Sequence, residues 1–167
     1  MHLKARAKIN WSLVVTGQRE DGYHLLDMVV QRLELHDEIE IRKSEGLTLQ
    51  VEGAPELASG GQNLALRAAR LLRDSSGCPD GAAMVLRKHI PMQAGLGGGS
   101  ADAAAALTGL NHLWGLNLPM DTLAALGLKL GADVPLCLKD GLVRVRGIGE
   151  AVSAQGGGKA LHLLLLQ

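Results

Sequence analysis

The feature that most constrains how this chain folds is the glycine run GLGGG at residues 95–99. A strand pattern over residues 83–90 precedes it, and the alanine-rich stretch after it predicts a helix that Ser100 can cap and that runs to about Leu113. Glycines allow a positive φ and a close approach of the backbone to a ligand. The first N–H groups of a helix are unpaired and lie at the positive end of its dipole. The junction therefore predicts either a phosphate-binding loop or a flexible turn that caps the helix.

Two well-known phosphate-binding templates do not fit this junction. A P-loop carries a lysine directly after its glycines, but the residue here is Ser100. A dinucleotide-binding fingerprint needs a glycine at the same position. Asp102, an anion in the first turn of the predicted helix, disfavours a bare phosphate, but it suits the helix dipole and could help to hold a cation. The glycines alone therefore leave the ligand undefined.

The rest of the chain has the periodicity of one α+β domain. Alternation of apolar and polar residues over 3–15 predicts a half-buried strand, with Lys8 and Asn10 on its polar face. The other predicted strands are 23–35, 38–43, 47–52, 83–90, 142–146 and 161–166, the predicted helices are 63–75, 100–113 and 119–130, and residues 54–61 are predicted to form a loop. Strands followed by a helix, a strand, two helices and further strands are typical of α+β folds.

Composition narrows the function classes. The chain is 47% hydrophobic but has no Phe and one Tyr, so aliphatic residues must fill its core. Its net charge is zero, which argues against nonspecific nucleic-acid binding. Cys78 and Cys137 match no metal or redox spacing. With no secretory signal pattern and no apolar run long enough to span a bilayer, we expect a cytoplasmic protein with neither a nucleic-acid nor a membrane partner.

Several segments together resemble one family. Residues 91–104, PMQAGLGGGSADAA, resemble the ATP-phosphate loop of the GHMP kinases, in the form used by the 4-diphosphocytidyl-2-C-methyl-D-erythritol kinases. The segments AKIN (7–10), DGYH (21–24), GADVP (131–135) and RGIGE (146–150) are similar to family motifs in the same order. The resemblance implies the N-terminal domain fold of this superfamily (ribosomal protein S5 domain 2-like), with a mixed sheet packed against helices.

The resemblance also assigns a catalytic pair and a substrate pocket. It implies that Asp133 accepts the proton of the substrate hydroxyl and that Lys8 supports the charge of Asp133 and of the transferred group. The residues alone, without the resemblance, favour a solvated lysine and a turn-forming aspartate. The implied substrate-binding residues are Asn10, Tyr23, His24 and Ala132, where the alternative for Tyr23 is a residue that closes a hairpin.

For the nucleotide, the resemblance implies ATP with Mg²⁺, and Ser100 is the candidate metal ligand. Simpler roles are open for four of the predicted ATP-binding residues: Asn63 as a helix cap, Leu64 in the core, Lys88 on the surface and Met92 as a gap filler. The implied ATP-binding residues are Pro91, Met92, Gln93, Ala94, Gly95, Leu96, Gly97, Gly98, Gly99, Ser100, Ala101, Asn63, Leu64 and Lys88.

The implied function is ATP-dependent phosphorylation of the 2-hydroxyl of 4-diphosphocytidyl-2-C-methyl-D-erythritol, a small-molecule substrate, in non-mevalonate isoprenoid synthesis. We expect residues 1–167 to form the N-terminal ATP-binding and catalytic domain, without the family's C-terminal domain, so that docking of that domain or self-association could cover an exposed face. The alternatives are a nucleotide- or phosphate-binding module without turnover, and a homoserine, galactose or mevalonate kinase. An RNA-binding domain is a third alternative, which the zero net charge and the single Tyr disfavour.

Overall fold

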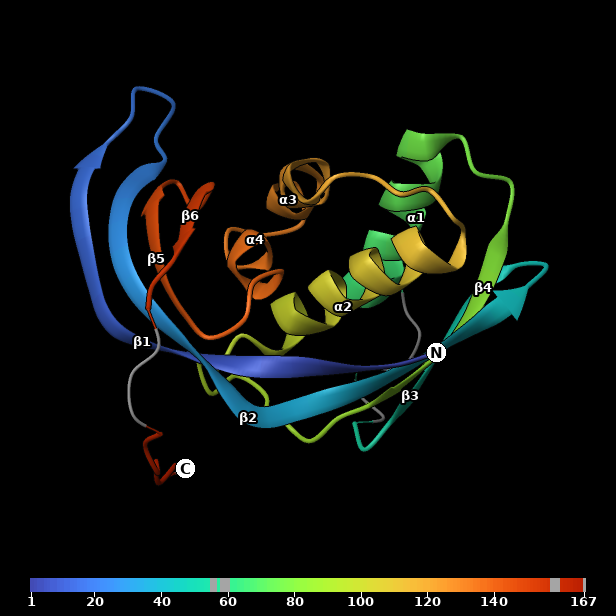
Figure 1. The fold of residues 1–167 in the computed structure, drawn as a ribbon, viewed down its shortest axis with the longest axis horizontal. Coiled ribbons are helices and arrows are strands. Elements are labelled where there is room, and N and C mark those ends of the chain that lie inside the picture. The colour runs from blue at the N-terminus through green and yellow to red at the C-terminus, as the bar shows by residue number, and fades with distance from the viewer. Residues whose placement is uncertain (55–56, 58–60, 157–159, 167) are drawn as a thin grey trace.

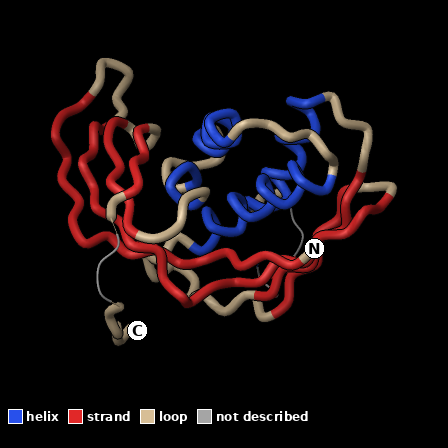
Figure 2. Tube along the Cα trace, viewed as in Figure 1, coloured by secondary structure: helices blue, strands red, loops and turns tan. Residues whose placement is uncertain are grey.

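The computed structural model describes residues 1–54, 57, 61–156 and 160–166. Within them, a curved sheet holds four helices on its concave face (Figure 1). Figure 2 shows the strands bending around one side of the helical layer. The elements are β1 (His2–Gln18), β2 (His24–Ser44), β3 (Leu47–Glu52), α1 (Leu64–Ser76), β4 (Gly81–Arg87), α2 (Gly98–Leu113), α3 (Met120–Leu128), α4 (Val134–Cys137), β5 (Leu142–Gly147) and β6 (Ala151–Ala154).

The long strand β2 organises the sheet. One edge of β2 pairs antiparallel with β1, from His24 to Glu40. The other edge pairs with β5 as far as Gln31, and then with β4 from Glu38 onward. Strand β3 adds to β4 in parallel, and β6 adds to β5. Among the described strands, residues 32–37 of β2 therefore have no ladder partner on that second edge, so the sheet is split there.

The core lies between the sheet and the helices α1 and α2. It is aliphatic, as the composition predicts, and its largest fully buried side chains include Ile39 and Ile41 of β2 and Leu72 of α1. The alanine run of α2 is buried on all sides, since residues 101–107 are each at most 8% exposed. Small side chains let this central helix lie close to the sheet: a Cβ on Gly109 would lie 2.6 Å from the Ile41 Cδ1 atom.

The predicted mixed α+β architecture is confirmed, and β3 has the predicted bounds. Residues 23–35 and 38–43, predicted as two strands, form the single strand β2, because His36 and Asp37 at the expected break pair with Arg6 and Ala5 of β1. Residues 161–166 form no strand, which corrects that prediction: they have no ladder partner among the described strands, and Leu166 is 89% exposed. The short elements α4 and β6 were not predicted.

The start of α2 and the loop before α1 were also predicted from the sequence. Helix α2 begins at Gly98 with Gly97 as its N-cap, so Ser100 lies within the first turn instead of capping the helix. The loop predicted over residues 54–61 lies largely outside the described residues. None of the described helices is both long and apolar enough to cross a bilayer.

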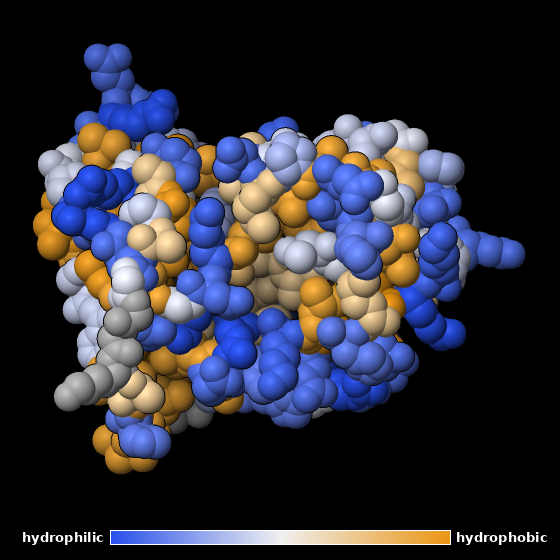
Figure 3. Space-filling view, viewed as in Figure 1, coloured by the Kyte–Doolittle hydropathy of each residue, from blue (hydrophilic) through white to orange (hydrophobic). Residues whose placement is uncertain are grey.

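Hydrophobic side chains also gather on the surface, toward the left of the view in Figure 3, over the β1–β2 hairpin and the C-terminal segment. On the hairpin, Trp11, Leu13, Val14, Val15 and Tyr23 are each about half exposed or more. The alternation over 3–15 predicted Trp11 and Leu13 on the buried face. Register shifts in β1, at Arg6/Lys8 and again at Asn10/Ser12, break that simple alternation.

Candidate active site

A register shift in β1 turns Lys8 toward the helices. The pairing of β1 with β2 shifts between Arg6 and Lys8, and the residue that strict alternation places on the solvated face is only 8% exposed. Its Nζ atom lies 3.2 Å from the Oδ2 atom of Asp133, which is the residue before α4. The interpretation of Lys8 as a solvated side chain is therefore wrong. Lys8 forms an ion pair with Asp133, 125 positions later in the sequence.

Asn10 belongs to the same group. The Lys8 ammonium donates a hydrogen bond to the Asn10 Oδ1 atom at 3.2 Å. The ammonium is thus held between an amide oxygen and a carboxylate, and the Asp133 side chain keeps one third of its surface exposed. The oriented ammonium can bind an anionic group, and the accessible carboxylate beside it can accept a proton from a hydroxyl.

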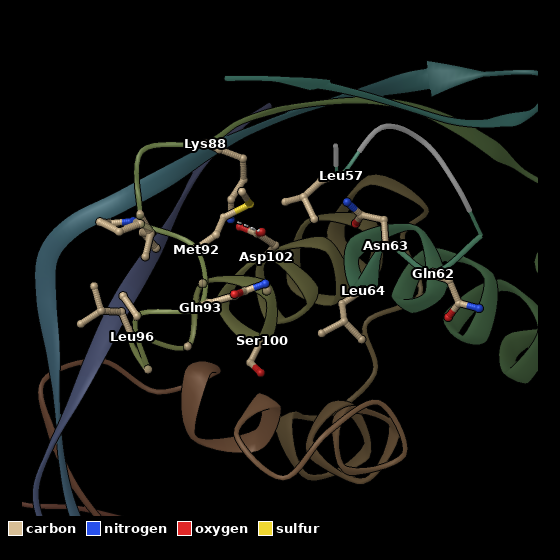
Figure 4. Close-up of a pocket in the computed structure, with 17 residues that line it drawn as sticks. Leu57, Gln62, Asn63, Leu64, Lys88, Met92, Gln93, Leu96, Ser100 and Asp102 are labelled. Atoms are coloured by element: carbon tan, nitrogen blue, oxygen red, sulfur yellow. Dashed lines mark hydrogen bonds and ion pairs between the residues drawn. The ribbon is translucent and has the colours of Figure 1, made fainter. Parts of the chain in front are cut away.

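The glycine-rich loop forms most of a cavity of about 460 Å³ at the N-terminus of α2 (Figure 4). Every residue predicted to bind ATP lines it except Ala101, which is fully buried in the core and whose N–H donates to the Gly97 carbonyl oxygen. Residues that line the cavity are Leu57, Gln62, Asn63, Leu64, Lys88, Ile90, Pro91, Met92, Gln93, Ala94, Gly95, Leu96, Gly97, Gly98, Gly99, Ser100 and Asp102.

The loop lies directly against strand β1 at Gly97. This residue has a φ of +70°, and a Cβ built on it would lie 2.9 Å from the Lys8 Cγ atom. The Lys8 N–H donates to the Leu96 carbonyl oxygen at 2.9 Å. Glycine is required here both for the left-handed backbone and for the close contact. The cavity and the Lys8–Asp133 pair are therefore adjacent parts of one site.

Asn63 and Leu64 have a structural role and also line the cavity. The Asn63 Oδ1 atom accepts a hydrogen bond from the Ala65 N–H at 2.9 Å and so caps α1, yet Asn63 also lines the cavity. Leu64 packs toward Gly99, where a Cβ would lie 3.3 Å from the leucine Cδ1 atom. Met92 is 38% exposed. The structural alternatives for Asn63 and Leu64 are therefore compatible with contact to a ligand.

Lys88 is not a surface residue, because its side chain is 5% exposed and pairs with two buried carboxylates. Its ammonium donates to Oδ2 of Asp37 and, at 2.7 Å, to Oδ2 of Asp102. Burial alone would lower the pKa of Lys88, but the two carboxylates outweigh it and raise that pKa. Burial raises the pKa of Asp102 to about 7, against the pull of Lys88. The Asp102 Oδ1 atom is buried with no hydrogen-bond partner among the described residues.

The structure does not bring Tyr23 and His24 into the cavity. Both lie at the exposed end of the β1–β2 hairpin, and Tyr23 is 62% exposed. The Tyr23 N–H donates to the Asp21 Oδ1 atom, as expected for a residue that closes a turn. Ala132 is exposed next to Asp133, and its carbonyl oxygen would lie 2.7 Å from a Cβ on Gly149.

Sequence reasoning missed three charged or polar residues near the site: Asp37, Arg32 and Cys137. Arg32 is 7% exposed, and its Nη1 atom donates to the Cys137 Sγ atom at 2.7 Å. Burial raises the pKa of the Cys137 thiol to about 11, although Arg32 acts in the opposite direction. Cys137 ends the short helix that Asp133 begins. No spacing in the sequence signals these contacts, because they join β2 to elements far along the chain.

Few groups at the site suit a metal ion. Among the described residues, no three His, Cys, Asp or Glu side chains cluster so as to hold one. The Ser100 hydroxyl lines the cavity in the first turn of α2. Since Mg²⁺ usually keeps several waters and binds through one or two protein oxygens plus substrate phosphates, this sparse donor set fits a nucleotide-bound Mg²⁺.

Comparisons of this chain with known proteins all point to the GHMP kinases. Residues 63–141 match the family model of the GHMP kinases N terminal domain. A 4-diphosphocytidyl-2-C-methyl-D-erythritol kinase of Paramagnetospirillum magneticum is 47% identical over 152 residues, 90% of this chain and 53% of the relative. The enzyme of the same name from Alkaliphilus metalliredigens is 42% identical over 166 residues, 99% of this chain and 57% of the relative. The chain thus spans about half the length of the curated relatives it matches.

Solved structures agree with this. The crystal structure of a 4-(cytidine 5'-diphospho)-2C-methyl-D-erythritol kinase superposes with a TM-score of 0.76 at 39% identity, covering 93% of this chain and 55% of the other. Mevalonate kinase of Methanococcus jannaschii superposes with a TM-score of 0.66 at 15% identity, covering 94% and 56%, and shares the fold alone. Residues 63–141 are therefore similar to the GHMP kinases N terminal domain, and the chain has the fold of that domain.

Proposed function

We propose that this chain carries the nucleotide-binding and phosphoryl-transfer site of an ATP-dependent small-molecule kinase. The observation that carries the proposal is the contact between Gly97 and Lys8, with Asp133 ion-paired to the same lysine at 3.2 Å. The cavity at the N-terminus of α2, where backbone N–H groups can bind phosphate, thereby borders a carboxylate that can accept a proton. Residues 1–167 form the N-terminal ATP-binding domain in this proposal, and we expect it to act in the cytoplasm.

The mechanism follows from the roles of these groups. Backbone N–H groups of the loop and of the first turn of α2 bind the phosphates. As the substrate hydroxyl oxygen forms its bond to the γ-phosphorus, the bond from that phosphorus to the bridging oxygen of ADP breaks, and the hydroxyl proton passes to Asp133. Lys8 stabilises the negative charge of the transferred group and orients Asp133. Positioning supplies much of the rate, since phosphoryl transfer needs little covalent help from the protein.

Magnesium would be held by the triphosphate and the Ser100 hydroxyl. When bound, Mg²⁺ neutralises charge on the phosphate oxygens. Lining positions from Pro91 to Ser100, with Asn63, Leu64 and Lys88, complete the proposed ATP-binding set.

The proposed phosphoryl acceptor is the 2-hydroxyl of 4-diphosphocytidyl-2-C-methyl-D-erythritol, because relatives at 42–51% identity bear the name of that kinase. Asn10 and Ala132 flank the Lys8–Asp133 pair and suit contact with the acceptor end of the substrate. Tyr23 and His24 are proposed to contact the cytosine, where an exposed aromatic ring can stack on the base.

The test measures ADP released from MgATP by this chain, with and without that substrate, and compares the chain with Asp133→Asn. We expect substrate-dependent ADP that the variant loses while it still binds MgATP. Asp133→Asn preserves shape and removes the charge, so equal loss of binding and turnover would contradict a catalytic role for Asp133.

A second candidate function is nucleotide binding without turnover. The observation that favours it is that the cavity gathers nearly all of the predicted ATP-binding residues, whereas the predicted substrate-binding residues Tyr23 and His24 do not line it. MgATP binding by a folded chain that releases no ADP with any of the methylerythritol, homoserine, galactose or mevalonate substrates would support this alternative over the kinase.

A further inference from the structure

The split in the sheet brings a buried carboxylate to the start of the glycine-rich loop. Pairing between β2 and β4 ends at Glu38 and Arg87, and Asp37 is the next residue of β2 beyond that pair. Asp37 is fully buried. Its Oδ1 atom accepts hydrogen bonds from the N–H groups of His89, at 2.5 Å, and Ile90, at 2.8 Å. The Asp37 side chain thus supplies hydrogen-bond acceptors in place of the β-ladder at the point where β4 leaves the sheet.

The other oxygen of Asp37 reaches the far end of the loop through Lys88. The Lys88 ammonium donates to Oδ2 of Asp37 and to Oδ2 of Asp102 in the first turn of α2. Figure 4 shows Lys88 and Asp102 meeting beside the cavity. The Lys88 and Asp102 side chains are only 5% and 3% exposed, so little water competes for these bonds. One carboxylate therefore holds the loop where it leaves β4, and the lysine between the two carboxylates holds it where α2 begins.

The glycines next to this group leave room for it. A Cβ on Gly98 would lie 3.3 Å from the Lys88 Nζ atom, which is a tight contact, and 3.5 Å from the Asp37 Oδ2 atom, which is an ordinary van der Waals contact. The backbone of Gly98, which lines the cavity, thus packs directly on the charged group. Movement of that group would move the loop backbone that lines the cavity.

We propose that Asp37, acting through Lys88 and Asp102, is a positioning residue that holds the glycine-rich loop in its phosphate-binding shape. This inference rests on the proposed nucleotide-binding function of the loop. Asp37 itself does not line the cavity. By holding the loop in place before a nucleotide binds, Asp37 lowers the conformational entropy that the loop loses on binding. A preorganised loop therefore binds the nucleotide more tightly.

The experiment compares Asp37→Asn and Asp37→Ala with the parent chain and with a matched control, Asp27→Asn. Asp27 also lies on β2 and pairs with Arg144, but at the end of the sheet away from the loop. The amide oxygen of Asn can still accept from His89 and Ile90, whereas Ala removes every contact. We expect the MgADP dissociation constant to rise at least about tenfold in Asp37→Ala, and by less in Asp37→Asn, a tenfold change being ~1.4 kcal/mol.

Two further readouts separate positioning from general damage. At saturating MgATP, turnover of Asp37→Asn should return close to the parent value, so the loss lies in KM for ATP and not in kcat. Hydrogen exchange at the amides of His89, Ile90 and the loop should speed up in both Asp37 variants and stay unchanged in Asp27→Asn.

The outcomes distinguish this inference from the proposed function. Parent-like MgADP affinity and parent-like loop exchange in a folded Asp37→Asn and Asp37→Ala would overturn the positioning role. If Asp37→Ala does not fold, Asp37→Asn alone decides, by the same two measurements. A parent chain that binds no MgADP would instead refute the nucleotide site, and faster exchange in the Asp37 variants would still support the anchoring of the loop.

Discussion

Replacing Gly97 by alanine tests whether the glycine-rich loop and Lys8 are one unit, and Gly77→Ala is a matched control. Both glycines adopt a left-handed backbone, with φ of +70° and +65°. A non-glycine residue in that region costs ~1–2 kcal/mol, so both variants should lose about that much stability. The two sites differ in their surroundings: nothing lies within 4 Å of a Cβ on Gly77, which ends α1.

At Gly97 the added methyl group meets Lys8. Its carbon would lie 2.9 Å from Cγ and 3.0 Å from Cε of the lysine, where carbon atoms prefer a separation of ~3.5–4.0 Å. The lysine stem must therefore retreat by roughly 0.5–1 Å, and such overpacking typically adds ~1–3 kcal/mol to the loss of stability. The ammonium would leave its 3.2 Å contact with Asp133. Misplacement by ~1 Å can cost on the order of 100-fold in rate.

Urea unfolding and steady-state ADP release measure the two effects separately. We expect Gly97→Ala to be ~1–3 kcal/mol less stable than Gly77→Ala. We also expect it to lose most of its turnover, while Gly77→Ala keeps the parent kcat and KM. Equal stability and equal turnover in the two variants would refute the close contact between Gly97 and Lys8 and, with it, the argument that joins the cavity to the ion pair.

Three other predictions follow from the described contacts. Asn63→Ala removes a helix cap and should lower stability by ~1 kcal/mol in urea unfolding, while Asn63→Asp, which can still cap, should not. The hydrogen bond from Arg144 lowers the pKa of Asp27 below 3.8, so its stabilising effect is present above that pH and is lost as the pH falls through the lower folded value. The stability difference between the parent and Asp27→Asn should accordingly shrink from neutral to strongly acidic pH. Because the Cys137 thiol is buried with a raised pKa, a thiol reagent should label Cys78 first in the folded chain, and equal labelling rates would contradict the buried placement.

The sequence predicts well those features that depend on neighbours in the chain. The alanine-rich helix after the glycines, the bounds of β3 and the cap at Asn63 follow from local periodicity and chemistry. Predictions fail where tertiary contacts override local pattern. Strict alternation places Lys8 in solvent, but the register shift in β1 buries it, and no residue between Arg6 and Lys8 signals that shift.

The split of the sheet explains which site residues sequence reasoning misses. Over residues 32–37, one edge of β2 has no strand partner among the described elements, so side chains must satisfy the neighbouring backbone and fill the gap. Arg32 and Asp37 lie at its two ends. Asp37 accepts hydrogen bonds from the N–H groups of His89 and Ile90, just before the glycine-rich loop, and Arg32 contacts the helix that begins after Asp133. In sequence both look like ordinary charges on an alternating strand. Their importance comes from the divergence of β4 and β5 along one edge of β2, which opens the sheet near the glycine-rich loop and Asp133.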